Sequence, residues 1–429
     1  MPTARGFLTA MIGIALWGAG RVFGAEPLEQ IGFALVGLVV VGVIIVNSRR
    51  HDLSIKRSVV PDRAKAGQQV TIKLQLHNAG RGAAPLMLLD DRLPLELAGR
   101  ARFALNGIEA RGLREAQYQI RPPRRGRYPI GPLNISFVDP FGLASTRAVG
   151  TNADDLLVHP RTEKLALPRD LGQQRSVSAS ALRQLTGTRG EDFFTMREYV
   201  EGDDLRKIHW PSTAKRDRPM IRQEETPWHT RALILLDDRR AAHDGVGDSS
   251  SFERAVETCA SVADLYHRSG YTYGLLTADN RGMPSGRGTD HYHRCLDLMA
   301  VLTPALMPSD HDPLLMRLAE LQANITDQGT LVIALGSLSG DVAAAVTRCT
   351  RRFRQIIVVA FPAHRYGAQP TKERWEGEQL THDAAIMLRR AGVHTLILGP
   401  GDSLTIAWAS LSSASRGGAH AWAQRHAPV

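Results

Sequence analysis

Two long apolar segments open the chain. The first, residues 7–25, carries one charge, Arg21, and the second, residues 28–47, carries none between Ile31 and Val46. A helix needs about 20 predominantly apolar residues to cross a bilayer. We therefore predict that residues 1–50 form a transmembrane helical hairpin, whose helices span about 7–25 and 28–47 and are joined by a short acidic turn.

Charges beside these segments predict the orientation of the hairpin. Arg5 precedes the first segment, the turn carries Glu26 and Glu29, and the basic residues after the second segment are Arg49, Arg50, Lys56 and Arg57. Because positive charge stays on the cytoplasmic side, we expect a multi-pass protein of the cell membrane with its soluble domains in the cytoplasm. The alternative is a cleaved signal peptide over residues 1–25, which ends in a poor cleavage site. Even then, the second helix would anchor the chain.

Alternating apolar and polar positions replace the continuous runs over residues 51–160. Val70, Ile72, Leu74 and Leu76 alternate with polar residues, as in a strand with one buried face. Further strand candidates recur between turns that contain Gly and Pro, at residues 86–89, 102–105, 115–121 and 133–137. This spacing predicts an Ig-like β-sandwich.

Two short segments of this region have their own predictions. Residues 124–132 are basic and rich in turn residues. They form either a patch for lipid or phosphate or a solvated hairpin, and charge runs usually face water. We expect Phe141 to plug the edge of the sandwich and Gly142 to form a tight turn.

Residues 229–411 alternate between short apolar runs and helical periodicities. Strands are predicted at 231–236, 271–278, 330–335, 355–361 and 394–398, and helices at 252–268, 314–323, 341–353 and 383–391. Such alternation predicts a doubly wound α/β domain with a parallel sheet. Residues 161–228 are polar and are interpreted as a linker that carries a dense motif, and residues 412–429 as a flexible tail.

The composition is that of a globular protein. The 429 residues are 43% hydrophobic and 22% charged, which excludes global disorder and a polytopic transporter. The net charge of +10 comes from scattered arginines, so it favours a cytoplasmic body beside a membrane, and we expect no specific nucleic acid as partner. Three separated cysteines without a CxxC pair indicate neither a zinc site nor a redox dithiol, and we expect them to be reduced and buried.

The densest motif lies in the linker region, where arginines and carboxylates alternate. Bidentate ion pairs are possible there, so we interpret it as a partner-binding or structural motif made of Arg197, Glu198, Tyr199, Gly202, Asp203, Asp204, Arg206 and Trp210. The alternative is an enzyme of unknown chemistry that uses these carboxylates with His209, since adjacent aspartates can bind Mg²⁺. No GxSxG, HExxH or Walker A sequence supports that alternative.

This motif resembles the signature of the domain-of-unknown-function 58 family. The matching elements are Asp192-Phe193, Met196-Arg197-Glu198-Tyr199, Gly202-Asp203-Asp204, Arg206, Ile208 and Trp210, with Thr213-Ala214-Lys215 where the family usually has Ser-Ala-Arg. Upstream, Arg125–Tyr128, Asp139–Leu143 and the two N-terminal helices also resemble the family. The resemblance implies a bacterial membrane protein with a C-terminal von Willebrand factor A-like domain.

In a domain of that type, the first strand is followed by Asp-x-Ser-x-Ser, whose oxygens bind Mg²⁺. Here the corresponding residues are Asp237, Arg239 and Ala241, so both serine positions are lost. A guanidinium at the place of the ion opposes cation binding. We therefore expect a degenerate metal site with no bound metal and no cofactor.

Taken together, these patterns predict a membrane-anchored α+β multidomain protein that acts as a non-enzymatic scaffold or adaptor. The resemblance implies partnership with a MoxR-type AAA+ ATPase and with a transglutaminase-like membrane protein. The alternatives are the enzyme described above and a binder of anionic lipid or nucleic acid through the scattered arginines.

Overall fold

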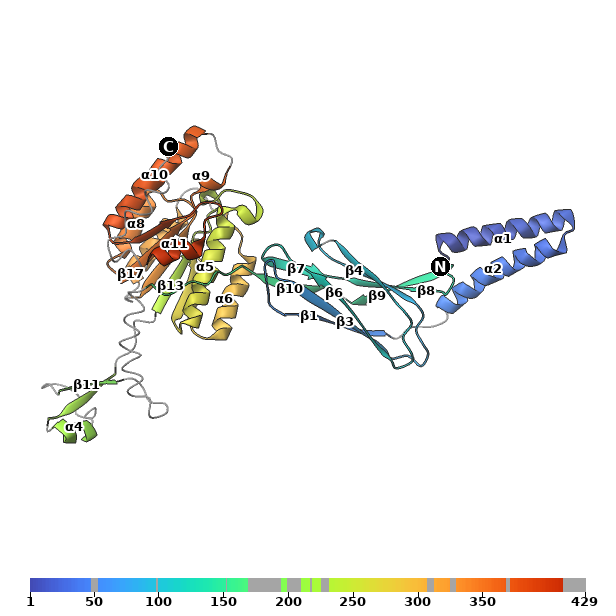
Figure 1. Ribbon diagram of the computed structural model, residues 1–429, viewed down its shortest axis with the longest axis horizontal. Coiled ribbons are helices and arrows are strands. Elements are labelled where there is room, and N and C mark those ends of the chain that lie inside the picture. Colours follow the sequence, from blue (N-terminus) through green and yellow to red (C-terminus); the bar gives the residue numbers. More distant parts are fainter. Residues whose placement is uncertain are drawn as a thin grey trace. The chain divides into compact units, whose positions relative to one another are not determined.

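A computed structural model describes residues 1–47, 53–97, 99–151, 153–168, 194–198, 210–216, 218–224, 231–306, 312–324, 329–367 and 371–411. The chain forms two compact units. One consists of residues 1–161 with 299–301, and the other of residues 162–298 with 302–429. The first unit holds the helical hairpin and a β-sheet region, and the second holds an α/β sheet (Figure 1).

Helices α1 (Ala4–Phe23) and α2 (Glu26–Asn47) form the hairpin. Each is long and apolar enough to cross a membrane, as the sequence predicts. Glycines allow the two backbones to approach closely, as in membrane helix pairs: a Cβ on Gly32 would lie 2.6 Å from the Gly13 carbonyl oxygen. Gly24 ends α1 in the left-handed conformation, with φ of 67°.

Three antiparallel or mixed sheets follow, with strand orders β1-β3-β6, β2-β10-β7 and β5-β4-β8-β9. The alternation predicted for β3 is confirmed, because Val70, Ile72, Leu74 and Leu76 are fully buried. The strands are β1 (Leu53–Val60), β2 (Ala64–Lys65), β3 (Val70–Asn78), β4 (Met87–Arg92), β5 (Arg100–Leu105), β6 (Leu113–Ile120), β7 (Gly126–Ile130), β8 (Leu133–Val138), β9 (Ser145–Thr151) and β10 (Asp154–His159), with a 3-10 turn, η1 (Leu95–Leu97), between β4 and β5.

Part of the basic segment is a strand that the sequence does not predict: residues 126–130 form β7, which pairs with β10 and buries Tyr128. One expectation for this region is wrong. Phe141 does not plug the sheet edge, because its side chain is 63% exposed. It lies in the corner between β8 and β9, where Gly142 has the predicted turn conformation, with φ of 70°.

A buried ion network joins strands from all three sheets. Arg57 on β1 donates from Nη2 to Oδ1 of Asp91 on β4 at 2.8 Å and from Nη1 to Oδ2 of Asp154 on β10 at 2.7 Å. The Tyr118 hydroxyl on β6 donates to Oδ2 of Asp91 at 2.7 Å. The side chains of Arg57 and Asp91 are 1% and 0% exposed, and burial raises the pKa of Asp91 although Tyr118 and Arg57 lower it. Each charge therefore depends on its partner.

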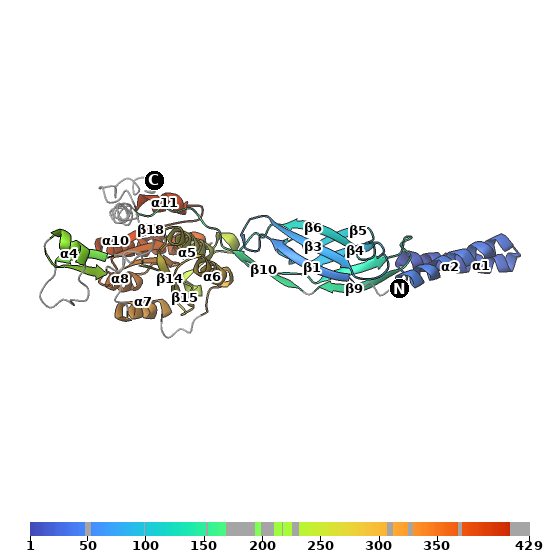
Figure 2. The ribbon, with the colours of Figure 1, turned by 90° about the horizontal axis from the view of Figure 1, so that it is seen from below.

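The second unit contains a six-stranded sheet of order β15-β14-β13-β16-β17-β18. All neighbours are parallel except β14 and β15. Helices lie beside the strands of this unit (Figure 2). Its elements are β13 (Arg231–Leu236), α5 (Ser251–Arg268), β14 (Thr272–Thr277), β15 (Gly282–Gly286), α6 (Thr289–Val301), α7 (Pro313–Asn324), β16 (Thr330–Leu335), α8 (Gly340–Cys349), β17 (Gln355–Ala360), α9 (Ala363–Tyr366), α10 (Thr371–Arg390), β18 (His394–Ile397) and α11 (Leu404–Ser410), with 3-10 turns η4 (Arg240–Ala242) and η5 (Gly247–Ser249).

Every strand and helix predicted for residues 231–398 is present in this unit, although α10 begins at Thr371, well before the predicted residue 383. The sequence did not predict β15 or α6. The three cysteines are free and buried, as expected. In sequence, two short strands precede the α/β sheet. β11 (Phe194–Glu198) pairs antiparallel with β12 (Met220–Glu224), and α4 (Trp210–Arg216) lies between them in sequence.

The Arg57 network generates a stability prediction. Replacing Asp91 with Ala leaves the buried Arg57 charge without its main partner, so the first unit should lose about 3–5 kcal/mol. Hydrogen–deuterium exchange of peptides from β1 and β4, measured on the full chain, should show faster exchange. Arg102→Ala is the control: it removes an ion pair with Asp90 from the same sheet, but Arg102 is 62% exposed, so the loss should stay below about 1 kcal/mol. Equal protection in both variants would contradict the prediction.

Candidate functional site at the carboxyl edge of the α/β sheet

The candidate site lies where the strand order of the α/β sheet reverses. β13 is central, with β14 on one side and β16 on the other. From the carboxyl ends of β13 and β16, the chain therefore continues toward opposite edges of the sheet. In open α/β sheets, ligands usually bind at this point. Asp237 and Asp238 follow β13 directly, and both side chains are fully buried there.

Arg239 neutralises Asp237 with a two-pronged ion pair. Its Nε donates to Oδ1 of Asp237 and its Nη2 to Oδ2, both at 2.8 Å. Its Nη1 donates to Oδ2 of Asp312 at 2.5 Å. Burial lowers the pKa of Arg239, but the ion pairs with Asp237 and Asp312 raise it more, so it lies above its ordinary value. The guanidinium thus bridges two carboxylates as a bound cation would.

Backbone groups complete the surroundings of Asp237. The Gly336 N–H, after β16, donates to Oδ2 of Asp237 at 3.3 Å. A Cβ on Gly336 would lie 2.2 Å from the Ala242 carbonyl oxygen, so a larger residue cannot occupy this position without a shift of the backbone. Oδ1 of Asp312 accepts from the Leu314 N–H at 2.9 Å, which caps the start of α7. Asp312 therefore holds α7 and Arg239 together.

His243 fixes the loop after β13. Its Nε2 lies 2.7 Å from the Asp237 carbonyl oxygen and its Nδ1 lies 3.0 Å from the Ser251 hydroxyl. A carbonyl oxygen only accepts, so we assign the ring proton to Nε2. Burial lowers the pKa of His243 although the Asp237 charge raises it. The side chain is therefore neutral at neutral pH and acts as a structural support.

A second pair of charges lies beside the first. Nη2 of Arg281 is 3.0 Å from Oδ2 of Asp238, and Nε of Arg281 is 2.5 Å from Oδ2 of Asp279. Burial and the neighbouring Asp279 raise the pKa of Asp238 to about 6. The pKa of Asp279 is lowered, because hydrogen bonds and Arg281 outweigh its burial. One guanidinium again serves two carboxylates.

This arrangement leaves no place for a divalent cation beside Asp237, because the Arg239 guanidinium uses both carboxylate oxygens. Ala241, the second lost serine position, lies in η4 and offers no side-chain oxygen. Among the described residues, no group of three or more His, Cys, Asp or Glu side chains is arranged to hold a metal ion.

The residues of the central motif are only partly described. Arg197 and Glu198 end β11, opposite Ile221 and Met220 on β12. Trp210 begins α4 and is 69% exposed. The remaining predicted motif residues lie outside the described part of the chain: Tyr199, Gly202, Asp203, Asp204 and Arg206. Its interpretation as a partner-binding or structural motif therefore stays a prediction.

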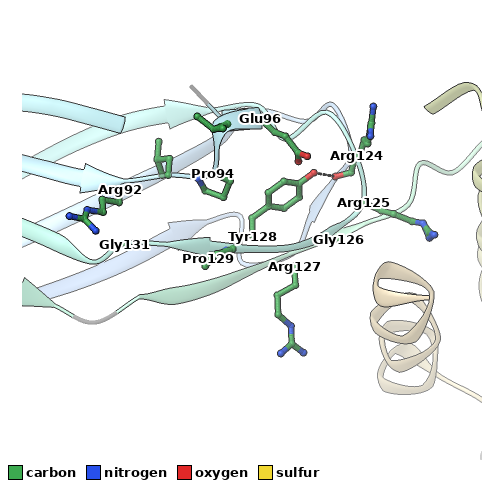
Figure 3. A pocket seen from close by; sticks show the side chains of 12 residues that line it. Arg92, Pro94, Glu96, Arg124, Arg125, Gly126, Arg127, Tyr128, Pro129 and Gly131 are labelled. Atoms are coloured by element: carbon green, nitrogen blue, oxygen red, sulfur yellow. Dashed lines mark hydrogen bonds between the residues drawn. The ribbon is translucent and has the colours of Figure 1, made fainter. Parts of the chain in front are cut away.

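The basic segment of the first unit does not form an anion site of converging charges. It borders an open pocket of about 650 Å³, where the Tyr128 hydroxyl donates to the Arg124 carbonyl oxygen at 3.0 Å. Figure 3 shows that the arginine side chains around the pocket extend in different directions, namely those of Arg92, Arg124, Arg125 and Arg127. The geometry therefore gives the lipid-or-phosphate interpretation of this patch no support.

Sequence reasoning found Asp237, Arg239 and Ala241 but missed Asp312, Asp279 and Arg281. One signal for Asp312 was present: Asp-Pro at residues 312–313 is a helix-start pattern. Asp279 likewise follows a strand end, as Asp237 does. Nothing local indicates that Arg281 reaches Asp238.

The comparisons with known proteins agree with this picture only at the level of the family. A family described as "Protein of unknown function DUF58" matches residues 195–366. This range includes the central motif and the Asp237–Arg239 site. The match covers less than half of the chain, and its description assigns no activity.

Two uncharacterized proteins are similar to parts of the chain. Rv1480 of Mycobacterium tuberculosis is 27% identical over 25% of this chain and 35% of its own length. YeaD of Bacillus subtilis is 24% identical over 43% of this chain and 44% of its own length. The chain thus spans less than half the length of these relatives. Among solved structures, the CARDB domain of PF1109 from Pyrococcus furiosus matches 26% of this chain and 88% of its own at 13% identity, with a TM-score of 0.19, too low to support a conclusion.

The Arg239 geometry predicts how the site responds to magnesium. The wild-type protein should give no heat of Mg²⁺ binding in titration calorimetry, because the guanidinium already occupies both oxygens of Asp237. The double substitution Arg239→Ser and Ala241→Ser restores the hydroxyls and removes the competing charge, so Mg²⁺ should then raise the Tm of the variant. Micromolar Mg²⁺ binding by the wild type that is lost in Asp237→Ala would sink this interpretation.

Proposed function

We propose that the protein is a non-enzymatic, membrane-anchored scaffold whose α/β domain docks a protein partner. The observation that carries this proposal is the Arg239 guanidinium bound between Asp237 and Asp312 at the switch point of the sheet. A catalytic or metal-binding site would leave the carboxylates at this edge free, whereas here they form ion pairs within the chain. What such an edge retains is a fixed shape, and a fixed shape suits docking.

The proposal includes the nature of the two folded regions. The alternation of β and α elements, the central strand that ends in Asp237 and the position of Arg239 support a von Willebrand factor A-like domain with a degenerate ion site. The sheets of residues 53–159 support an Ig-like sandwich that acts as a spacer. Both assignments extend the resemblance of the sequence to the domain-of-unknown-function 58 family.

The partner that we propose is a MoxR-type AAA+ ATPase, together with a transglutaminase-like membrane protein. This rests on the family resemblance. The central motif offers a specific contact. Trp210 is 69% exposed, lies within the segment that matches the family and begins α4. Exposed tryptophans are costly to leave in water and are frequent energetic centres of interfaces.

A substitution tests the docking role. Trp210→Ala should reduce the recovery of the ATPase that copurifies with the full-length protein by tenfold or more, about 1.4 kcal/mol or above, without lowering the Tm. Copurified proteins are identified by mass spectrometry. Trp375→Ala is the matched control, because Trp375 on α10 is also exposed, at 61%, and lies outside the family segment. Equal recovery with both variants, or recovery of no ATPase with the wild type, contradicts the proposal.

We further propose that the hairpin spans the cell membrane, with the start of α1, the end of α2 and the soluble domains in the cytoplasm. Apolar side chains cover its exposed surface, for example Phe7, Leu8, Phe33 and Ile44, and the basic flanks of the hairpin favour this direction. A reporter enzyme that is active only in the cytoplasm, fused after Val60, should be active in cells. Activity confined to a reporter that functions only outside the cytoplasm would reverse the orientation.

A further inference from the structure

The corner between β8 and β9 is bound directly to the start of the hairpin. The Thr3 hydroxyl donates to the Gly142 carbonyl oxygen at 2.7 Å, and the Thr3 N–H donates to the Leu143 carbonyl oxygen at 2.8 Å. A Cβ on Gly6 would lie 1.9 Å from that Leu143 oxygen. α1 therefore begins in contact with the corner, and its lipid-facing part starts only after Gly6.

One face of the end of α2 packs against the same region. Gly42 faces Asp139 and Ala144, which a Cβ would approach to 3.4 and 3.7 Å. Val46 is 1% exposed and belongs to the apolar core of the sandwich, and Val43 packs against that core. One face of this stretch, at Gly42, Val43 and Val46, is thus covered by protein, while Ile44 and Ile45 on the other face stay 56% and 44% exposed at the level of the corner.

The apolar surface that the hairpin offers to lipid has a limit at each end. At its other end the Arg21 guanidinium lies 3.8 Å from the Glu29 carboxylate, which marks the polar boundary. Between the two limits, residues 7–20 of α1 span about 21 Å and residues 30–45 of α2 about 24 Å, at about 1.5 Å per residue. The hydrocarbon core of a bilayer is about 30 Å thick. Extension of Arg21 to the headgroups adds only a few ångströms.

The β8–β9 corner carries an exposed apolar side chain that would add to the apolar length of the hairpin. Phe141 is 63% exposed although its turn is tightly fixed. Oδ2 of Asp139 accepts from the Phe141 N–H at 3.0 Å, and Oδ1 accepts from the Ala144 N–H at 2.5 Å. Asp139 itself is buried, at 1% exposure. The turn thus holds an aromatic side chain outward next to the helices, at the level where the apolar surface of the hairpin ends.

Neighbouring loops at this end of the sandwich add suitable residues. The Leu86 carbonyl oxygen accepts from the Val138 N–H at 3.0 Å, and Leu86 is 37% exposed. Leu113 opens β6 opposite His77 and is 56% exposed. Arg81 and Arg111 are exposed in the loops that meet there. Apolar side chains flanked by arginines match the boundary of a bilayer with anionic headgroups.

We propose that the β8–β9 corner, with Phe141 at its tip, is embedded in the interfacial layer of the bilayer that the hairpin enters. The sandwich is then seated on lipid and does not hang from a flexible tether. This inference rests on the proposed membrane anchoring, and it identifies the lipid surface as a second contact of the soluble region.

Spin labelling of the full-length protein in vesicles of phosphatidylcholine and phosphatidylglycerol tests the inference. Single cysteines replace Phe141, Leu95 and Phe33 in separate variants, and each carries a nitroxide. The native cysteines are buried, and burial raises the pKa of the Cys349 thiol to about 11, so they react slowly. Leu95 is the control within the same unit: it is 93% exposed and follows the opposite end of β4 from Met87.

The collision rate with a water-soluble nickel chelate should be several-fold lower at position 141 than at position 95, and the oxygen collision rate should be higher. The label at position 33 should be protected most. If position 141 is as accessible to nickel as position 95 while position 33 stays protected, the corner is free in water and this inference fails, although the anchor stands. If position 33 is also accessible, the anchoring fails, and the inference with it. A bimane label on the same cysteines is a second probe, because bimane emission shifts to the blue in lipid. The same result with bimane at position 141 shows that the nitroxide itself does not move the corner.

Discussion

The charge of Asp237 and Asp238, buried side by side at the end of the central strand, is the constraint on which the α/β unit depends. An ionised carboxylate inside a protein is strongly unfavourable unless an opposite charge and hydrogen bonds compensate it. Domains that solve this with a metal ion depend on the concentration of that ion. Here Arg239 and Arg281 supply the positive charge from the same chain, and arginine stays protonated at any physiological pH. The edge of the sheet is therefore formed permanently.

The same constraint organises the β-sheet region of the first unit. Arg57 is buried among three acceptors, Asp91, Asp154 and the Ile130 carbonyl oxygen, so strands from separate sheets must come together for the charge to be compensated. Tyr118, which hydrogen bonds to Asp91, packs against both apolar clusters of the region. The Arg57 charge is compensated when β1, β4 and β10 lie as observed, so this network supports the register that the buried apolar faces specify. In both units, displacement of the arginine would leave a buried carboxylate without a compensating positive charge.

Local pattern explains what was predictable and what was not. The buried strands of the α/β sheet and the alternation of β3 carry their periodicity in neighbouring residues, so the sequence predicts them. β7 lies in a stretch of Arg, Gly and Pro, and only its pairing with β10 makes it a strand. The sequence predicts that Phe141 plugs the edge of the sheets, but Asp139 and the contacts with Thr3 fix its turn outward. Arg239 was predictable because it lies two residues from Asp237, whereas Arg281 reaches Asp238 only through the tertiary fold.

The hairpin packs on the β-sheet region and belongs to the same compact unit. Val46 lies in an apolar cluster of that region and Thr3 is hydrogen bonded to the β8–β9 corner. Removal of residues 1–25 would expose the glycine face of α2 that packs on Gly13 and would leave the corner without the partners of its carbonyl oxygens. These contacts join the hairpin and the β-sheet region within one compact unit. They also fix where the contacts with the β-sheet region end: Thr3 and Gly6 of α1 and one face of α2, at Gly42 and Val46, pack on that region, while Ile44 and Ile45 remain exposed.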